Sequence, residues 1–308
     1  MVRPFRPDEE KLAQIRELLP ATGAGIYLDA ATAGPFPAET ARALAEADDW
    51  ELRVGRAGPG RAEDIAQRAA EAKAVVAALL GVDPDGVVLT FGARDSVARL
   101  ARLAAALGRV EPVDLSLVAG ASPITLDGED AAVIDGHRWL LGPEGTGALW
   151  VGARLRSLVD PAALEAAGGL VPRRSLLGLA RSVGWLEMYV GLPWIHERTA
   201  RLSLRMTEGL RAIEGVDLRT PPDGPAVATF SIRGWTGEQA QDELSRRVFA
   251  IVGLDPDRDA IRASVGFWNS DEELDRFLEA VGEVAAHTPG TLPRRPSLTV
   301  LQSPGNGA

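Results

Sequence analysis

The stretch that decides the fold is DGHRWLLGPEGTGALWV, residues 135–151. It contains a Gly-His-Arg-Trp tetrapeptide, a glycine-rich loop and a closing apolar run at residues 147–151. The apolar run has no polar side chains in alternation, which is typical of a strand covered on both faces of its sheet. The loop lacks the Gly-Lys-Ser/Thr end of a P-loop, so by itself it is weak evidence for phosphate binding.

The composition excludes several classes of chemistry. The chain has 308 residues, a formal net charge of -10 and no cysteine. Without cysteine there is no disulfide, no thiol nucleophile and no thiolate metal ligand. The three histidines, His137, His196 and His287, are far apart and lack metal-binding spacing, so we expect no metal site.

Charge and hydropathy favour a soluble, cytoplasmic protein. The acidic balance argues against a nucleic-acid partner, which would require a basic face. Residues 1–20 carry charges throughout and have no apolar core of a signal peptide. No apolar run approaches the roughly 20 residues of a membrane helix, so we expect no membrane association.

Hydrophobic periodicity predicts alternating helices and strands. The expected helices lie at residues 8–18, 38–52, 62–80, 92–107, 175–190, 195–213 and 237–247, with a last helix from residue 270. The expected strands lie at residues 87–91, 113–118, 131–134, 147–151, 226–232, 248–253 and 260–266. The last helix opens with a capping box, in which Ser270 is the N-cap and Glu273 the third helical residue.

Four segments, in order along the chain, resemble one enzyme family. YLDAATAGP (27–35) is similar to its opening Tyr-Leu-Asp-Asn-Ala-Ala-x-Gly-Pro, and TFGARDS (90–96) is similar to its phosphate cup. DGHRWLLGPEGTG (135–147) resembles Ser/Thr-Gly-His-Lys-Trp-Leu-x-Gly-Pro-x-Gly-Thr-Gly, and 262–275 resembles Arg-x-Ser…Tyr-Asn-Thr-x-Glu-Glu-Ile-Asp. This is the class V aminotransferase and cysteine desulfurase family, pyridoxal-phosphate (PLP) enzymes of fold type I that include isopenicillin N epimerase-like proteins.

The resemblance implies an α/β fold with two domains. We expect a PLP-transferase-like large domain with a mostly parallel sheet, and a smaller α+β C-terminal domain. Only 44 residues separate Gly92 from His137, and a βαβ unit takes roughly 30, so the sheet should be reduced. The expected divisions are an N-terminal helical segment at 1–25, a truncated large domain at 26–175, long helices with the small domain at 176–286, and a disordered tail at 287–308.

The signature departs from the family where the cofactor would bind. Arg138 stands at the position of the lysine that holds PLP as a Schiff base, and arginine remains charged and is not a nucleophile. Asp135 stands at the position of a Ser or Thr that contacts the cofactor phosphate, where a carboxylate would repel it. We expect an ion pair between Asp135 and Arg138. The alternatives are that both side chains point to solvent, or that Arg138 binds an anionic ligand.

Other cofactor contacts implied by the resemblance are also altered. The best match to the segment that contacts the pyridinium ring has Ala119 in place of the aspartate and Ser122 in place of the glutamine. In the phosphate cup, Gly92 and Ala93 follow the family pattern and Arg94 replaces a threonine. We therefore expect no cofactor, since covalent PLP binding is not supported.

Two residues keep their family identity. Arg262 matches the arginine that binds a substrate carboxylate, and its alternative role is an ion pair with an acidic side chain such as Asp29. His137 matches the histidine before the lysine. No residue is assigned as catalytic; Asp135, His137 and Arg138 are the remnant of the site.

These observations favour a degenerate class V aminotransferase-like protein that has lost Schiff-base chemistry. We expect it to act as a non-catalytic dimer partner, or as a regulatory or scaffold subunit, in a homodimer or in a heterodimer with an active paralogue. The alternative is a PLP-independent enzyme of specialised metabolism that acts on a small carboxylate through Asp135, His137, Arg138 and Arg262. Residual aminotransferase-like activity and non-covalent PLP binding stay open.

Overall fold

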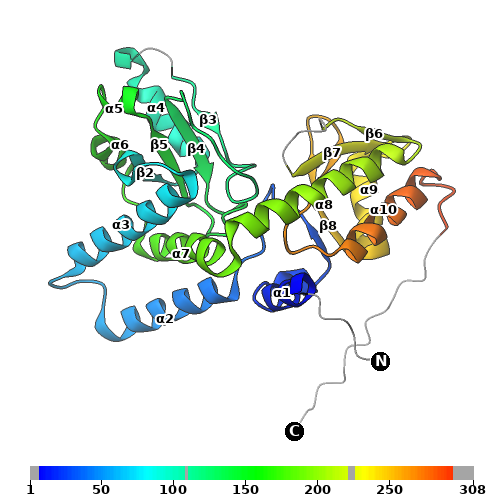
Figure 1. Ribbon diagram of the computed structural model, residues 1–308, viewed down its shortest axis with the longest axis horizontal. Coiled ribbons are helices and arrows are strands. Elements are labelled where there is room, and N and C mark those ends of the chain that lie inside the picture. The colour runs from blue at the N-terminus through cyan, green and yellow to red at the C-terminus, as the bar shows by residue number, and fades with distance from the viewer. Residues whose placement is uncertain (1–6, 108–109, 221–225, 294–308) are drawn as a thin grey trace, which may run out of the picture.

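The computed structural model describes residues 7–107, 110–220 and 226–293. It has two lobes, each built around one sheet, and the long helix α8 (Leu192–Ala212) runs from one lobe to the other (Figure 1). Among the described residues no helix is long and apolar enough to span a membrane. Residues 294–308 of the expected disordered tail lie outside the described residues.

The N-terminal lobe contains a four-stranded sheet in the order β2-β5-β4-β3. Its strands are β2 (Val87–Thr90), β3 (Val113–Asp114), β4 (Ala131–Asp135) and β5 (Gly147–Val151). The four strands begin where the sequence predicts them, although β3 is shorter than the expected 113–118. The α/β class is confirmed.

The expectation of a mostly parallel sheet is wrong, because the sheet is mixed. β5 pairs antiparallel with both β2 and β4, and only β3 and β4 pair in parallel. The cause is the length of the signature loop. A parallel crossover needs a connection of a dozen or more residues with room for a helix, and only residues 136–146 join β4 to β5.

Helices cover both faces of this sheet, as the continuous apolar strands predicted. One face packs on α3 (Arg61–Leu80) and α7 (Arg173–Gly184) through the cluster of Val76, Leu80, Leu89, Ile134 and Leu179. The other packs on the remaining helices of the lobe through Val88, Leu100, Val133, Leu149 and Leu164. These helices are α4 (Ala93–Leu107), α5 (Ala153–Arg156) and α6 (Pro161–Gly168).

The C-terminal lobe contains a five-stranded sheet in the order β1-β8-β9-β7-β6. Its strands are β1 (Ile26–Leu28), β6 (Val216–Leu218), β7 (Val227–Ile232), β8 (Ala250–Asp255) and β9 (Ala260–Ser264). β1 lies within the range 26–175 expected for the large domain, yet it pairs in parallel with β8. The chain therefore enters the C-terminal sheet before it builds the N-terminal one.

The helices of the C-terminal lobe pack on one face of its sheet. α8, α9 (Gly237–Val248) and α10 (Asp271–Ala285) share a core with the strands, in which Leu202, Leu244, Phe230 and Phe277 are buried. The expected capping box of α10 is confirmed: Ser270 accepts from the Glu273 N–H, and Glu273 accepts from the Ser270 N–H.

The first two helices of the chain, α1 (Pro7–Glu17) and α2 (Ala38–Val54), also match their expected ranges.

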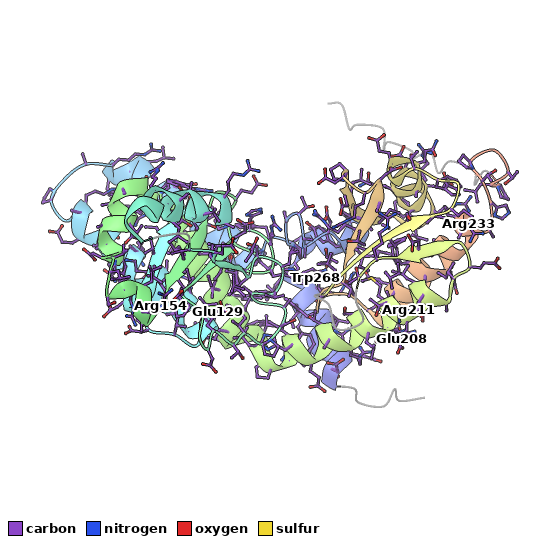
Figure 2. The ribbon with its side chains drawn as sticks, turned by 90° about the horizontal axis from the view of Figure 1, so that it is seen from above. Glu129, Arg154, Glu208, Arg211, Arg233 and Trp268 are labelled. Atoms are coloured by element: carbon purple, nitrogen blue, oxygen red, sulfur yellow. The ribbon has the colours of Figure 1, made fainter. Side chains whose placement is uncertain are left out.

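An aromatic cluster joins the two lobes. Trp139 of the signature loop lies 5.8 Å from Trp268, and Phe267 lies 4.9 Å from the same indole, between ring centroids. Trp268 is fully buried, and its Nε1 donates to the Tyr27 carbonyl at 3.0 Å. Figure 2 shows Trp268 between the lobes. The signature loop and the C-terminal lobe are thus fixed to each other through packed rings.

Substitution Trp268→Ala should therefore lower the free energy of unfolding by about 3–5 kcal/mol, because it removes a fully buried indole from the joint. Urea denaturation followed by circular dichroism measures this loss. Leu204→Ala, at a leucine that is 52 % exposed on α8, is the control and should cost no more than about 1 kcal/mol. Equal losses in the two variants would show that the joint does not stabilise the protein.

Candidate functional site

Asp135, the last residue of β4, places its carboxylate at the start of α4. The Ala93 N–H, in the first turn of α4, donates to Asp135 Oδ1 at 2.8 Å. Gly92 has a φ of 124°, and a Cβ at this position would lie 2.8 Å from the same oxygen. The backbone of the cup therefore closes around Asp135, and only glycine fits at residue 92.

Asp135 also pairs with Arg138. Arg138 Nε lies 3.0 Å from Asp135 Oδ2, and the two side chains are 28 % and 12 % exposed. The expected ion pair is present, and the alternative that both side chains point to solvent is wrong. The Arg138 Nε has no aligned hydrogen-bond acceptor, so the contact is ionic. Asp135 thus has one oxygen on a helix N-terminus and the other on a guanidinium.

Glycines let the signature loop pack against its neighbours. A Cβ at Gly147 would lie 2.6 Å from the Gly92 Cα, and a Cβ at Gly136 would lie 2.3 Å from Thr146 Oγ1. Gly34, in the turn after β1, donates its N–H to the His137 carbonyl at 2.9 Å. Three distant segments, the turn after β1, the start of α4 and the signature loop, therefore meet at one place.

A second set of charges faces this place from the C-terminal lobe. Arg262 Nη2 on β9 donates to Thr32 Oγ1 at 2.8 Å. Asp29 is half-buried beside Gly253, where a Cβ would lie 2.6 Å from Asp29 Oδ1. Burial raises the pKa of Asp29, although Thr32, Arg262 and Arg138 act to lower it. The alternative role of Arg262, an ion pair with Asp29, is not among the ion pairs of the described residues, and Arg262 binds Thr32 instead.

Within the described residues, the side chains of the other predicted site residues make no hydrogen bond or ion pair with Asp135, Arg138 or Arg262. Arg94 is exposed on α4 and has no partner within the described part of the chain. Ala119 is 1 % exposed and forms a short bridge with Ser122 in the turn after β3. His137 is half-buried, and its Nδ1 has no hydrogen-bond partner. No three histidine or carboxylate side chains gather for a metal within residues 7–107, 110–220 and 226–293.

Sequence reasoning missed three residues that support the site. Ser116 Oγ accepts from the Asp135 N–H at 3.0 Å, Thr32 binds Arg262, and Gly253 makes room for Asp29. Ser116 follows the polar-apolar alternation of residues 113–118, which was its one sequence signal. Thr32 and Gly253 gave none, because their partners lie far along the chain.

Solved structures identify the fold. A cysteine desulfurase from Thermococcus onnurineus NA1 matches 93% of this chain and 100% of its own, with a TM-score of 0.74 and 18% identity. A cysteine desulfurase from Escherichia coli matches 88% of this chain and 97% of its own, with a TM-score of 0.70 and 18% identity. The chain has the cysteine desulfurase fold.

Sequence comparison points the same way over a shorter span. No family model matches the chain. A probable cysteine desulfurase from Xylella fastidiosa is 27% identical over 193 residues, which cover 51% of this chain and 45% of the relative. The match thus spans less than half of that relative's length. These findings support the expected relation to cysteine desulfurases and class V aminotransferase-like proteins of PLP fold type I.

The raised pKa of Asp29 predicts a pH dependence of stability. A carboxyl with a higher pKa in the folded state binds its proton more tightly there, so its contribution to folding falls as pH rises from its ordinary value through the raised one. The stability of the wild type relative to Asp29→Asn should therefore fall over that window. Urea titrations at a series of pH values measure this difference.

The control for this measurement is Asp127→Asn, which changes an exposed aspartate. The difference between wild type and Asp29→Asn should fall more steeply over this pH window than the difference between wild type and Asp127→Asn. A flat difference for Asp29→Asn, or one that rises with pH, would contradict the burial of the Asp29 carboxyl in the folded protein.

Proposed function

We propose that this chain is a non-catalytic relative of the cysteine desulfurases that has lost PLP Schiff-base chemistry and acts by association. The observation that carries the proposal is the position of Asp135, whose carboxylate accepts from the Ala93 N–H and pairs with Arg138. The carboxylate of Asp135 and the guanidinium of Arg138 thus fill the places that the phosphate and the amine of a PLP enzyme would need.

The phosphate of PLP does not fit this arrangement. A helix N-terminus attracts anions through its free N–H groups and its dipole. At the start of α4 the Ala93 N–H is already bound to the Asp135 carboxylate. A dianionic phosphate placed there would lose this donor and would face a negative charge in a partly buried site, which is unfavourable.

The amine that PLP chemistry requires is also absent from the site. The guanidinium of Arg138 stays protonated and does not attack an aldehyde. The chain has two lysines, and both are held elsewhere. Lys11 Nζ lies 4.5 Å above the Trp194 ring, and Lys73 Nζ lies 2.6 Å from Glu165 Oε2. Neither lysine amine is therefore available to act in place of the lysine that the family has at position 138.

An apolar surface supports association. At the end of α2 the side chains of Trp50, Leu52 and Val54 are 47 %, 85 % and 54 % exposed. In Figure 1 this end of α2 projects from the N-terminal lobe with the loop that leads to α3. Trp50 and Val54 are four residues apart and share one face of α2, whereas Leu52 lies on another face. Contiguous exposed apolar side chains mark protein–protein contact sites. We propose that this surface binds a second copy of the chain or an active paralogue.

Sedimentation velocity tests the association directly. We expect a dimer of the chain, or a heterodimer when a co-encoded active paralogue is added, and Val54→Asp should weaken either complex by roughly tenfold or more because it places a charge in the apolar contact. Leu158→Asp, at a leucine that is 63 % exposed, is the control and should leave assembly unchanged. A strictly monomeric chain, alone and with any such paralogue, would contradict the proposal.

A second candidate function is supported by Arg262. Its Nε is buried without a hydrogen-bond partner, and Oδ1 of the neighbouring Asp29 is in the same state. Unsatisfied buried polar atoms are rare and call for an explanation. A PLP-independent enzyme that binds a small carboxylate between the lobes would use Arg262 as its anchor, with Asp135, His137 and Arg138 on the facing loop.

A thermal-shift screen with small mono- and dicarboxylates separates this second function from the first. If a carboxylate binds at Arg262, it should raise the melting temperature by about 2–4 °C once its concentration well exceeds the Kd. Arg262→Gln should abolish the shift, and Arg233→Gln, at an exposed arginine that Figure 2 places at the outer end of the C-terminal lobe, should retain it. No shift with any carboxylate would remove this candidate.

A further inference from the structure

A large cavity lies apart from the site around Asp135. It measures about 750 Å³, is partly open to solvent and is lined by the start of α2, the middle of α3, the end of α7 and the π-helical turn η3 (Trp185–Val190). None of the residues of the Asp135 site lines it. Its size is within the range of pockets that hold drug-sized ligands, which is roughly 300–1,000 Å³.

One wall of the cavity is an aromatic and thioether surface made by η3. The rings of Trp185 and Tyr189 stack with 6.1 Å between centroids and an interplanar angle of 17°. Tyr189 is 55 % exposed and Met188 is 84 % exposed, whereas Trp185 is 6 % exposed. π-Helical turns are rare and are frequently found at functional sites. Here the turn places a flat ring and a flexible apolar chain at the cavity rather than in the core.

Among the residues that the structure describes, the charges in the cavity leave one cation, a guanidinium, without an acidic partner. Of the two acids in the lining, Glu39 pairs with Arg42 at 3.0 Å and Glu71 pairs with Arg68 at 2.7 Å. The remaining charged residue of the lining is Arg181, and it has no acidic partner among the residues that the structure describes. The cavity therefore combines a planar apolar wall with one unpaired guanidinium.

We propose that this cavity binds a small molecule with a planar aromatic body and one anionic group, such as an aromatic carboxylic acid. The aromatic body lies against Tyr189 and Met188, where stacking and sulfur–aromatic contacts stabilise it. The carboxylate pairs with Arg181, whose planar guanidinium matches it in geometry. This site is independent of the association surface and of the Asp135 site.

The test uses 1-naphthoate and its uncharged analogue 1-naphthamide, with affinities measured by isothermal titration calorimetry. The wild type should bind naphthoate more tightly than naphthamide. Arg181→Gln should weaken naphthoate binding by roughly tenfold, because it removes one charge-assisted contact, and should leave naphthamide binding unchanged. Tyr189→Ala should weaken both ligands. Arg211→Gln, at an exposed arginine on α8 away from the cavity, is the matched control and should change neither.

Three results would overturn the proposal. The first is no detectable binding of naphthoate to the wild type at millimolar concentration. The second is an equal effect of Arg181→Gln and Arg211→Gln on naphthoate. The third is a change in sedimentation when Arg181→Gln or Tyr189→Ala is introduced, which would show that a second copy of the chain occupies the cavity. Circular dichroism of each variant confirms that the fold is intact.

Discussion

The contact between the Asp135 carboxylate and the first turn of α4 determines which groups the candidate site can bind. The end of β4, the glycine at residue 92 and the first turn of α4 converge here, and such a place attracts an anion. Here the anion belongs to the chain, and Arg138 balances it at 3.0 Å. The place at the start of α4 that would attract an external anion is thus filled by the Asp135 side chain.

Much of the fold follows from local patterns in the sequence. Continuous apolar runs predicted the buried strands β2, β4 and β5, and the pairing of Ser270 with Glu273 predicted the start of α10. These features depend on neighbouring residues, so they are legible without the tertiary structure. The ion pair of Asp135 with Arg138 was predictable for the same reason, because three residues within one turn bring the side chains together.

The remaining features depend on contacts between distant parts of the chain. β1 joins the C-terminal sheet through β8, more than two hundred residues later, and no local signal selects that partner. Arg262 likewise donates to Thr32, and makes no ion pair with Asp29 among the described residues, because of how β9 lies against the turn after β1. The antiparallel direction of β5 was available from the sequence, since residues 136–146 are too few for a crossover. The expectation of a mostly parallel sheet followed from the family resemblance and not from the length of this connection.

Intact mass spectrometry after incubation with PLP and reduction with borohydride tests whether the chain has lost Schiff-base chemistry. We expect the wild type to keep its unmodified mass, whereas the double variant Asp135→Ser, Arg138→Lys should gain one reduced PLP adduct, mapped by peptide digestion to position 138. The double variant frees the start of α4 and restores an amine. A stoichiometric adduct on the wild type at Lys11 or Lys73 would contradict the claim that Schiff-base chemistry has been lost.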